Sequence, residues 1–209
     1  MRRAFLGLIF LSAAAPAFAQ QPEKIPLMVF DAHAAFVSLG HDALTAASLG
    51  ATSEDLAGHG LGLLAGLHVY PLRGANVALG VGGELVLVRA AHQAQDQTTG
   101  LPIGPEIDRR FQSLSGQVSL NFGHQRGWSY ISGGTGPVAF DTYPKGSIPD
   151  SLRTMTVNYG GGARWFNTKH LAFSLDLRFY LTKAAPPTLI VAERAKTKLL
   201  VISAGISMK

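Results

Sequence analysis

The stretch Leu171-Ala-Phe-Ser-Leu-Asp-Leu-Arg-Phe-Tyr-Leu181 alternates apolar and polar side chains. Leucine or phenylalanine occupies every odd position, and the even positions include Ser174, Asp176, Arg178 and Tyr180. Successive side chains of a β-strand point to opposite faces of the sheet. The stretch therefore predicts a strand with one wholly apolar face and one polar face.

Seven further segments show the same alternation, which gives eight predicted strands: 28–39, 61–70, 77–88, 111–122, 128–140, 154–166, 171–181 and 198–208. The gaps between them alternate in length. The short ones are 71–76, 124–127 and 167–169, and the long ones are about 41–57, 90–110, 141–153 and 183–197. Alternating segments of about ten residues, separated in turn by short and long gaps, are typical of bacterial outer-membrane barrels, which have short periplasmic turns and long external loops. We therefore predict an all-β, eight-stranded antiparallel up-and-down transmembrane β-barrel. Its weakest strand is 128–140, which contains Gly133, Gly134, Gly136 and Pro137.

The N-terminus has the pattern of a secretory signal peptide. Arg2 and Arg3 supply its positive charge, an apolar run covers 4–15, and Ala17-Phe18-Ala19 is a small-x-small cleavage signal. We expect residues 1–19 to be the signal peptide and residues 20–209 to be one barrel domain. After Ala19 no run approaches the roughly 20 apolar residues that a spanning helix needs. The predicted location is the bacterial outer membrane.

Composition is consistent with a barrel and excludes some other classes. The chain has no cysteine, 24 glycines and only 15% charged residues. A small exported protein without disulfides needs another source of stability, which a closed barrel provides by pairing every strand edge. The net charge of +5 falls to +3 without Arg2 and Arg3, which is too modest and too dispersed to indicate nucleic-acid binding.

Aromatic residues gather near the predicted strand ends. Tyr70, Trp128, Trp165 and Phe166 flank short turns, and Phe111, Phe140, Tyr143 and Phe179 lie toward long loops. Amphipathic aromatic side chains favour membrane interfaces, so these two sets predict the aromatic girdles of a barrel.

Residues 158–180 also resemble a known family. A glycine-rich strand (Asn158-Tyr-Gly-Gly-Gly-Ala-Arg), a short turn and Leu-x-Phe-x-Leu-Asp-Leu-Arg-Phe-Tyr resemble the penultimate hairpin of the small outer-membrane β-barrels. That family includes OmpA-type, OmpW-type and opacity-protein-like barrels. The resemblance implies the same fold and location. Such barrels often end in an aromatic residue, whereas this sequence ends Ser207-Met208-Lys209.

Six polar residues on the inner face form the candidate site: Glu84, Gln117, Asn158, Arg164, Asp176 and Arg178. An eight-stranded barrel is just wide enough for side chains to fill it, and buried charges must be paired. We expect the two acids, Glu84 and Asp176, to face the two arginines as an internal plug. The alternative is a narrow gated pore or a small-ligand site.

No catalytic, metal or cofactor site is predicted. The seven histidines are scattered, and none has a spacing that would place two ligands on one strand face: His33, His41, His59, His68, His92, His124 and His170. None is followed two residues later by serine, so no strand sets a base beside a nucleophile. A Ser–His pair formed between strands stays open, because Ser174 and other serines point inward.

The predicted role is that of a structural or surface-interaction barrel that is not an enzyme. Its expected partners are outer-membrane lipid and lipopolysaccharide, with no nucleic acid and an unspecified extracellular partner. The alternatives are a small channel or transporter and a lipid-modifying outer-membrane enzyme. In a soluble lipocalin-like barrel, the apolar face of each strand would point inward and the polar face outward. It is disfavoured because Gly, Ser and Asn, rather than Lys and Glu, dominate the polar face.

Overall fold

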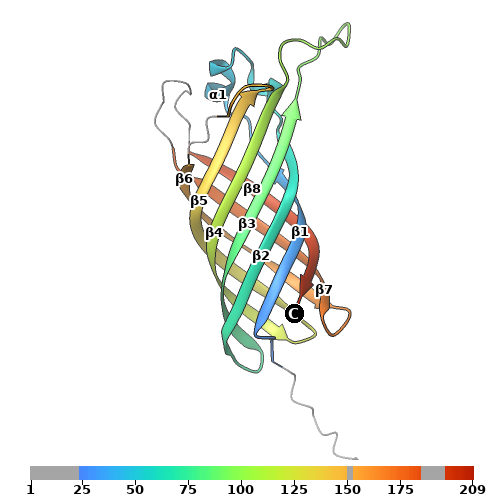
Figure 1. Ribbon diagram of the computed structural model, residues 1–209, viewed down its shortest axis with the longest axis vertical. Helices are drawn as coiled ribbons and strands as arrows, with labels where there is room; N and C mark the ends of the chain where they lie inside the picture. The colour runs from blue at the N-terminus through green and yellow to red at the C-terminus, as the bar shows by residue number, and fades with distance from the viewer. Residues whose placement is uncertain (1–23, 150–152, 185–195) are drawn as a thin grey trace, which may run out of the picture.

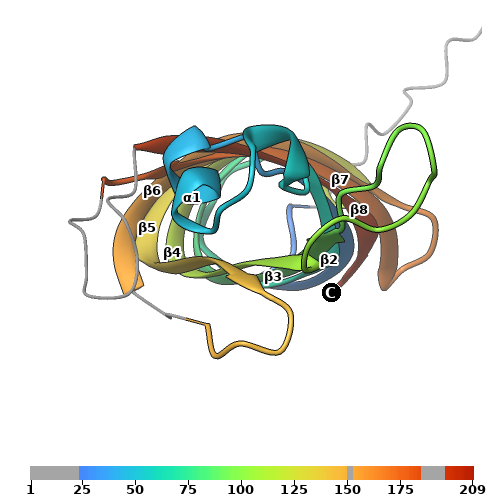
Figure 2. The ribbon, with the colours of Figure 1, turned by 90° about the horizontal axis from the view of Figure 1, so that it is seen from above.

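The computed structural model describes residues 24–149, 153–184 and 196–209, so the predicted signal peptide lies outside it. Eight antiparallel strands each pair with their neighbours in sequence, and the last pairs with the first to close a barrel (Figures 1 and 2). The strands are β1 (Met28–Ser38), β2 (His59–Arg73), β3 (Val77–His92), β4 (Ile107–His124), β5 (Gly127–Pro144), β6 (Arg153–Phe166), β7 (Leu171–Thr182) and β8 (Thr197–Met208). The predicted eight-stranded barrel is confirmed.

Several strands are longer than the alternation indicated. β2 to β5 contain 15 to 18 residues each, more than the roughly 9–11 that cross a membrane. They extend the wall at the long-loop end, at the top of Figure 1. The predicted loop 90–110 therefore shrinks to 93–106, and residues 141–144 belong to β5. Residues 71–73, which the sequence predicts as part of a turn, instead continue β2 past a β-bulge between Val69 and Leu72.

The weakest predicted strand, β5, is complete despite its glycines and proline. Its ladder with β4 runs from Ile107–Pro144 to Ser113–Val138 and resumes at Gly116–Thr135. Gly136 and Pro137 lie in the interruption, where proline, which has no N–H, leaves a gap in the hydrogen bonding. Both residues remain paired with β6, so the barrel wall is continuous.

The outside of the barrel is apolar. Burial alternates residue by residue along β7, and the outward residues include Phe173, Leu175 and Leu177. Leu177 on β7 is 43% exposed, and Leu114 on β4 is 58% exposed. An apolar belt continued around a closed sheet is the surface that a barrel presents to lipid. Over the described parts of the chain, no helix is long and apolar enough to cross a membrane.

The predicted aromatic girdles are partly wrong. Trp165 is 47% exposed and stacks on Phe173 at the outer surface, as expected of an interfacial residue. Tyr70, Trp128 and Phe111 instead point into the barrel, where each is at most 3% exposed. The position of each residue in the alternation of its own strand decides whether its side chain points inward, and the aromatic rings at the lumen ends fill the barrel rather than anchor it.

The first long loop folds over the barrel mouth. It contains α1 (Ala43–Ser48), which begins at Asp42, whose side chain accepts a hydrogen bond from the backbone N–H of Leu44. Leu56 of this loop and Ala46 of α1 pack against Ile107 at the start of β4. Figure 2, which looks onto this end, shows α1 lying over one side of the ring of strands. Sequence alternation did not predict this helix.

Candidate functional site

The lumen of the barrel is layered along its axis. On β1 the inward residues are Val29, then Asp31 and His33, then Ala35 and Val37. Other strands add to each layer. One apolar cluster at the short-turn end contains Val29, Tyr70, Ala78, Trp128 and Tyr130, and another at the long-loop end contains Val37, Leu64, Val88, Phe111, Tyr180 and Val201 among others. A polar layer is enclosed between two apolar ones.

All six residues of the predicted site lie in this interior, and each is at most 4% exposed. Five of them form one cluster: Glu84, Gln117, Asn158, Asp176 and Arg178. The remaining residue, Arg164, belongs to a second cluster nearer the short-turn end. The side chains come from β3, β4, β6 and β7, so the polar layer joins opposite sides of the wall.

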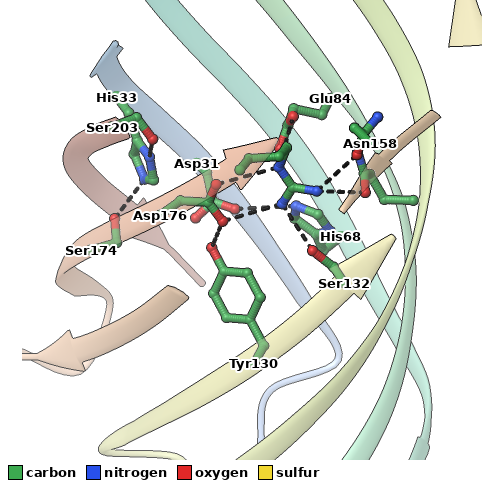
Figure 3. Close-up of polar contacts among 12 residues, drawn as sticks. Asp31, His33, His68, Glu84, Tyr130, Ser132, Asn158, Ser174, Asp176 and Ser203 are labelled. Carbon is green, nitrogen blue, oxygen red and sulfur yellow. Dashed lines mark hydrogen bonds and ion pairs between the residues drawn. The ribbon is translucent and has the colours of Figure 1, made fainter. Parts of the chain in front are cut away.

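Arg178 is the centre of the first cluster. Its guanidinium lies 3.3 Å from Glu84 Oε1 and 3.2 Å from Asp176 Oδ2. It donates hydrogen bonds to Gln117 Oε1 at 2.9 Å and to Asn158 Oδ1 at 3.0 Å. Figure 3 shows Glu84, Asp176 and Asn158 turned toward this one group. Arginine suits the position because its rigid fork of five N–H donors can serve several acceptors at once.

Two tyrosines complete the hydrogen bonding of the carboxylates. Tyr130 Oη donates to Asp176 Oδ2 at 2.8 Å, and Tyr180 Oη donates to Glu84 Oε1 at 2.5 Å. The rings of these tyrosines belong to the two apolar clusters, one at each end. The polar layer is therefore bonded to the apolar layers above and below it.

Arg164 pairs with a residue that the sequence prediction did not select. Its Nε lies 3.1 Å from Asp31 Oδ1, and one terminal nitrogen lies 2.6 Å from Asp31 Oδ2. Ser207 donates a further hydrogen bond to Asp31, and His68 Nε2 lies 3.4 Å from it. Glu84 and Asp176 thus face Arg178 alone. The correction follows from the slant of the strands, which decides which inward residues meet across the lumen.

A buried serine–histidine pair is also present. His33 Nε2 lies 2.7 Å from Ser174 Oγ, and His33 Nδ1 lies 3.0 Å from Ser203 Oγ (Figure 3). Gly205 on β8 faces His33, and a Cβ there would collide first with the backbone of Ala32 and His33 and then with the imidazole ring. Ser174 is fully buried and His33 is 4% exposed. The pair lies between the two apolar clusters and cross-links β1, β7 and β8.

Arg109 fastens the first long loop over the long-loop end of the lumen. Its terminal nitrogens donate to the backbone carbonyls of Gly40 and Ala57, each at 2.7 Å, and of Leu39 at 3.3 Å. The guanidinium also lies 5.0 Å from the centre of the Phe140 ring. The mouth of the barrel is therefore covered by chain that a buried arginine holds in place.

The second long loop, 93–106, projects beyond the barrel rim, as the hairpin at the top of Figure 1 shows. Leu101 is 65% exposed and Ile103 is 53% exposed on it. Asp96 orders the loop by accepting the backbone N–H groups of Thr99 and Thr98, each at 2.8 Å, and these bonds hold the pKa of Asp96 below its ordinary value. The loop thus presents apolar side chains on an ordered support.

Comparison with solved structures gives the fold. Neisserial surface protein A is 11% identical, with a TM-score of 0.54, over 88% of this chain and 97% of that one. Lower similarity (TM-score 0.46 in both cases) relates the chain to the attachment invasion locus protein Ail of Yersinia pestis, with 14% identity over 90% and 98% of the two chains, and to the outer-membrane protein OprG of Pseudomonas aeruginosa, with 15% identity over 90% and 97%. Neither a family model nor a curated protein matches the sequence. The closed sheet and its exposed apolar belt are those of a small bacterial outer-membrane barrel.

Proposed function

We propose that this outer-membrane barrel has a structural or surface-interaction role, with a lumen closed by its own side chains and with its long loops as the interacting surface. One observation carries the proposal. The polar layer centred on Arg178 is bonded from wall to wall and enclosed between two apolar clusters. A conducting pore of this size would need polar side chains that leave a continuous water path, whereas here they are used to bond one another.

The purified barrel is therefore expected to be silent in planar lipid bilayers, with no unit conductance steps. A band that moves faster without boiling than after boiling on a denaturing gel would show that the same preparation is folded. Reproducible steps of one size from folded protein would contradict the closed lumen and favour the channel alternative.

The long-loop end is the surface that we propose for an extracellular partner. Leu101 and Ile103 on the projecting loop are exposed apolar side chains of the kind that interfaces bury. Charges of both signs lie at the same end of the barrel, as in the ion pair of Lys145 with Glu106 at 2.6 Å. This mixture selects no particular class of partner.

Lipopolysaccharide is the lipid partner that we propose, on the outer wall near the long-loop end. The rings of Tyr159 and Phe179 lie 5.5 Å apart beside a shallow apolar groove with Gly161 at its floor. Lys198 Nζ lies 4.2 Å from the centre of the Phe179 ring. An acyl chain suits the groove, and an anionic lipid headgroup suits the lysine above it.

Lys198→Gln is expected to lower the lipopolysaccharide retained by the purified barrel about five-fold, since a cation near an anionic membrane surface contributes about 1 kcal/mol. The measurement is lipid A phosphate per mole of protein after detergent washing. Lys169→Gln, which removes an exposed lysine from the opposite end of the barrel, serves as the control and should change nothing. Equal retention by both variants would contradict the placement.

A further inference from the structure

The short-turn end of the barrel, at the bottom of Figure 1, carries basic side chains without acidic ones. Its described residues, 24–27, 71–77, 123–127, 166–171 and 208–209, include no Asp or Glu, but they include Lys24, Arg73, Arg126, Lys169 and Lys209. Within the described part of the chain, Arg126 and Lys169 form no ion pair, whereas the exposed Lys145 at the long-loop end pairs with Glu106 at 2.6 Å. No acidic side chain of the barrel balances these cations, which produce a positive potential at this end.

Three of the cations line a crevice of about 960 Å³ that spans the end of the lumen: Arg126 in the β4–β5 turn, Lys169 in the β6–β7 turn, and Lys209 after β8. The Phe166 ring also lines it and stacks on the lumen residue Trp128, with ring centres 5.2 Å apart. Lys209 Nζ donates to the backbone carbonyl of Gln125 at 3.0 Å and lies 4.1 Å from the centre of the Phe166 ring. The barrel wall separates the crevice from lipid, so a ligand would reach it from the solution at the short-turn end.

Uncharged hydrogen-bonding side chains lie between the cations. Gln125, Asn167 and Thr168 line the same crevice. The turn that carries two of them is ordered, because the backbone N–H of Leu171 donates to Thr168 Oγ1 at 3.0 Å and its carbonyl accepts from the N–H of Asn167 at 3.1 Å. Side-chain amides can both donate to and accept from a peptide backbone. The crevice therefore combines cations for carboxylates with groups for a main chain.

We propose that this crevice binds an acidic segment of a periplasmic protein. Short turns of bacterial outer-membrane barrels face the periplasm, so a soluble partner has access to this end. Carboxylates of the segment would accept charge-assisted hydrogen bonds from Arg126 and Lys169. Its main chain would bond to Gln125 and Asn167. The proposal rests on the membrane placement of the barrel and is independent of the extracellular surface proposed above.

An extended segment is favoured over a single small anion because the cations are divided among separate turns. Alternate residues of an extended chain point to the same side and lie about 6.7 Å apart. Successive acidic residues can therefore meet cations on neighbouring turns, whereas one small anion would reach only part of the set. Charge complementarity of this kind gives specificity and rapid association more than it gives affinity.

Fluorescence anisotropy tests the proposal, with a labelled peptide of alternating glutamate and serine titrated with the full chain folded in detergent. The peptide is expected to bind, and the same peptide with glutamine in place of glutamate is not. The variant Arg126→Gln/Lys169→Gln is expected to weaken binding about five-fold, because two exposed ion pairs together contribute about 1 kcal/mol. Raising the salt from about 0.1 M to about 1 M shortens the screening length from about 10 Å to about 3 Å and should also weaken wild-type binding.

The matched control is Lys24→Gln/Arg73→Gln, which removes the same charge from the same end. Neither residue lines the crevice, so binding should change little. Unchanged binding in the Arg126/Lys169 variant, or an equal loss in the control, would overturn the site, the second by showing only diffuse attraction. Tighter binding of soluble cell-wall fragments than of the peptide would assign the crevice to a different polymer. Heat-modifiable mobility of each variant is measured in parallel, so failure of the barrel to fold is distinguished from loss of the site.

Discussion

Arg178→Leu is expected to lower the free energy of unfolding by about 3–5 kcal/mol, the cost of leaving buried charges without their partner. Glu84 and Asp176 both face this guanidinium, and each is at most 4% exposed. Without it, two carboxylates share a lumen with no counter-charge between them. The measurement is urea unfolding of the barrel in lipid vesicles, followed by tryptophan fluorescence and by the gel shift between folded and unfolded protein.

Two further variants separate lost charge pairing from lost volume. Arg89→Leu removes an exposed arginine from β3 and should cost little. The triple variant Arg178→Leu/Glu84→Gln/Asp176→Asn removes the charges together and should recover part of the loss, since the uncompensated carboxylates are then absent. If Arg178→Leu and the triple variant are equally unstable, packing rather than charge explains the effect.

Arg164→Leu is expected to cost a similar 3–5 kcal/mol through a different partner. Arg164 makes two short contacts with Asp31, and its guanidinium lies 4.3 Å from the centre of the Tyr130 ring. The variant leaves Asp31 with only Ser207 and His68 beside it. The loss is measured by the same unfolding experiment, and Arg126→Leu, an exposed arginine at the same end, is the control.

A double-mutant cycle with Asp31→Asn isolates the pair. Because the two residues are in contact, the effects of Arg164→Leu and Asp31→Asn should not add, and the double variant should be more stable than the sum of the single losses predicts. Additive losses would mean that the ion pair contributes nothing beyond the two side chains separately.

Much of this architecture could be predicted because a barrel strand has a period of two. Parity alone assigned Glu84, Gln117 and Arg178 to the interior, and the structure places all three there. The alternation of short and long gaps between segments predicted the number of strands and their order. Glycine and proline in β5 weakened the local pattern without breaking the strand, because its neighbours on both sides hold it in register.

Partners across the lumen were not predictable in the same way. Parity places Asp31 inside, but the stagger of the closed sheet decides that it meets Arg164 on β6, and no single strand encodes that stagger. The aromatic residues show a second limit. A ring at a strand end suits both an interface and the end of a lumen, so composition could not separate Trp165 from Trp128. The same holds for His33 and Ser174, which lie far apart in sequence and meet only after closure.

The polar layer also bears on how the barrel closes at the seam between β1 and β8. Its ladder runs only from Phe30–Met208 to Ser38–Leu200, whereas that of β3 and β4 runs from Val77–Phe122 to His92–Ile107. Short backbone pairing at the seam is supplemented from within, by Asp31 with Ser207 and by His33 with Ser203. An open sheet would expose Asp31 to the bilayer with its partners out of reach, at a high energetic cost. The contacts of Asp31 and His33 across the seam therefore favour the closed barrel over an open sheet.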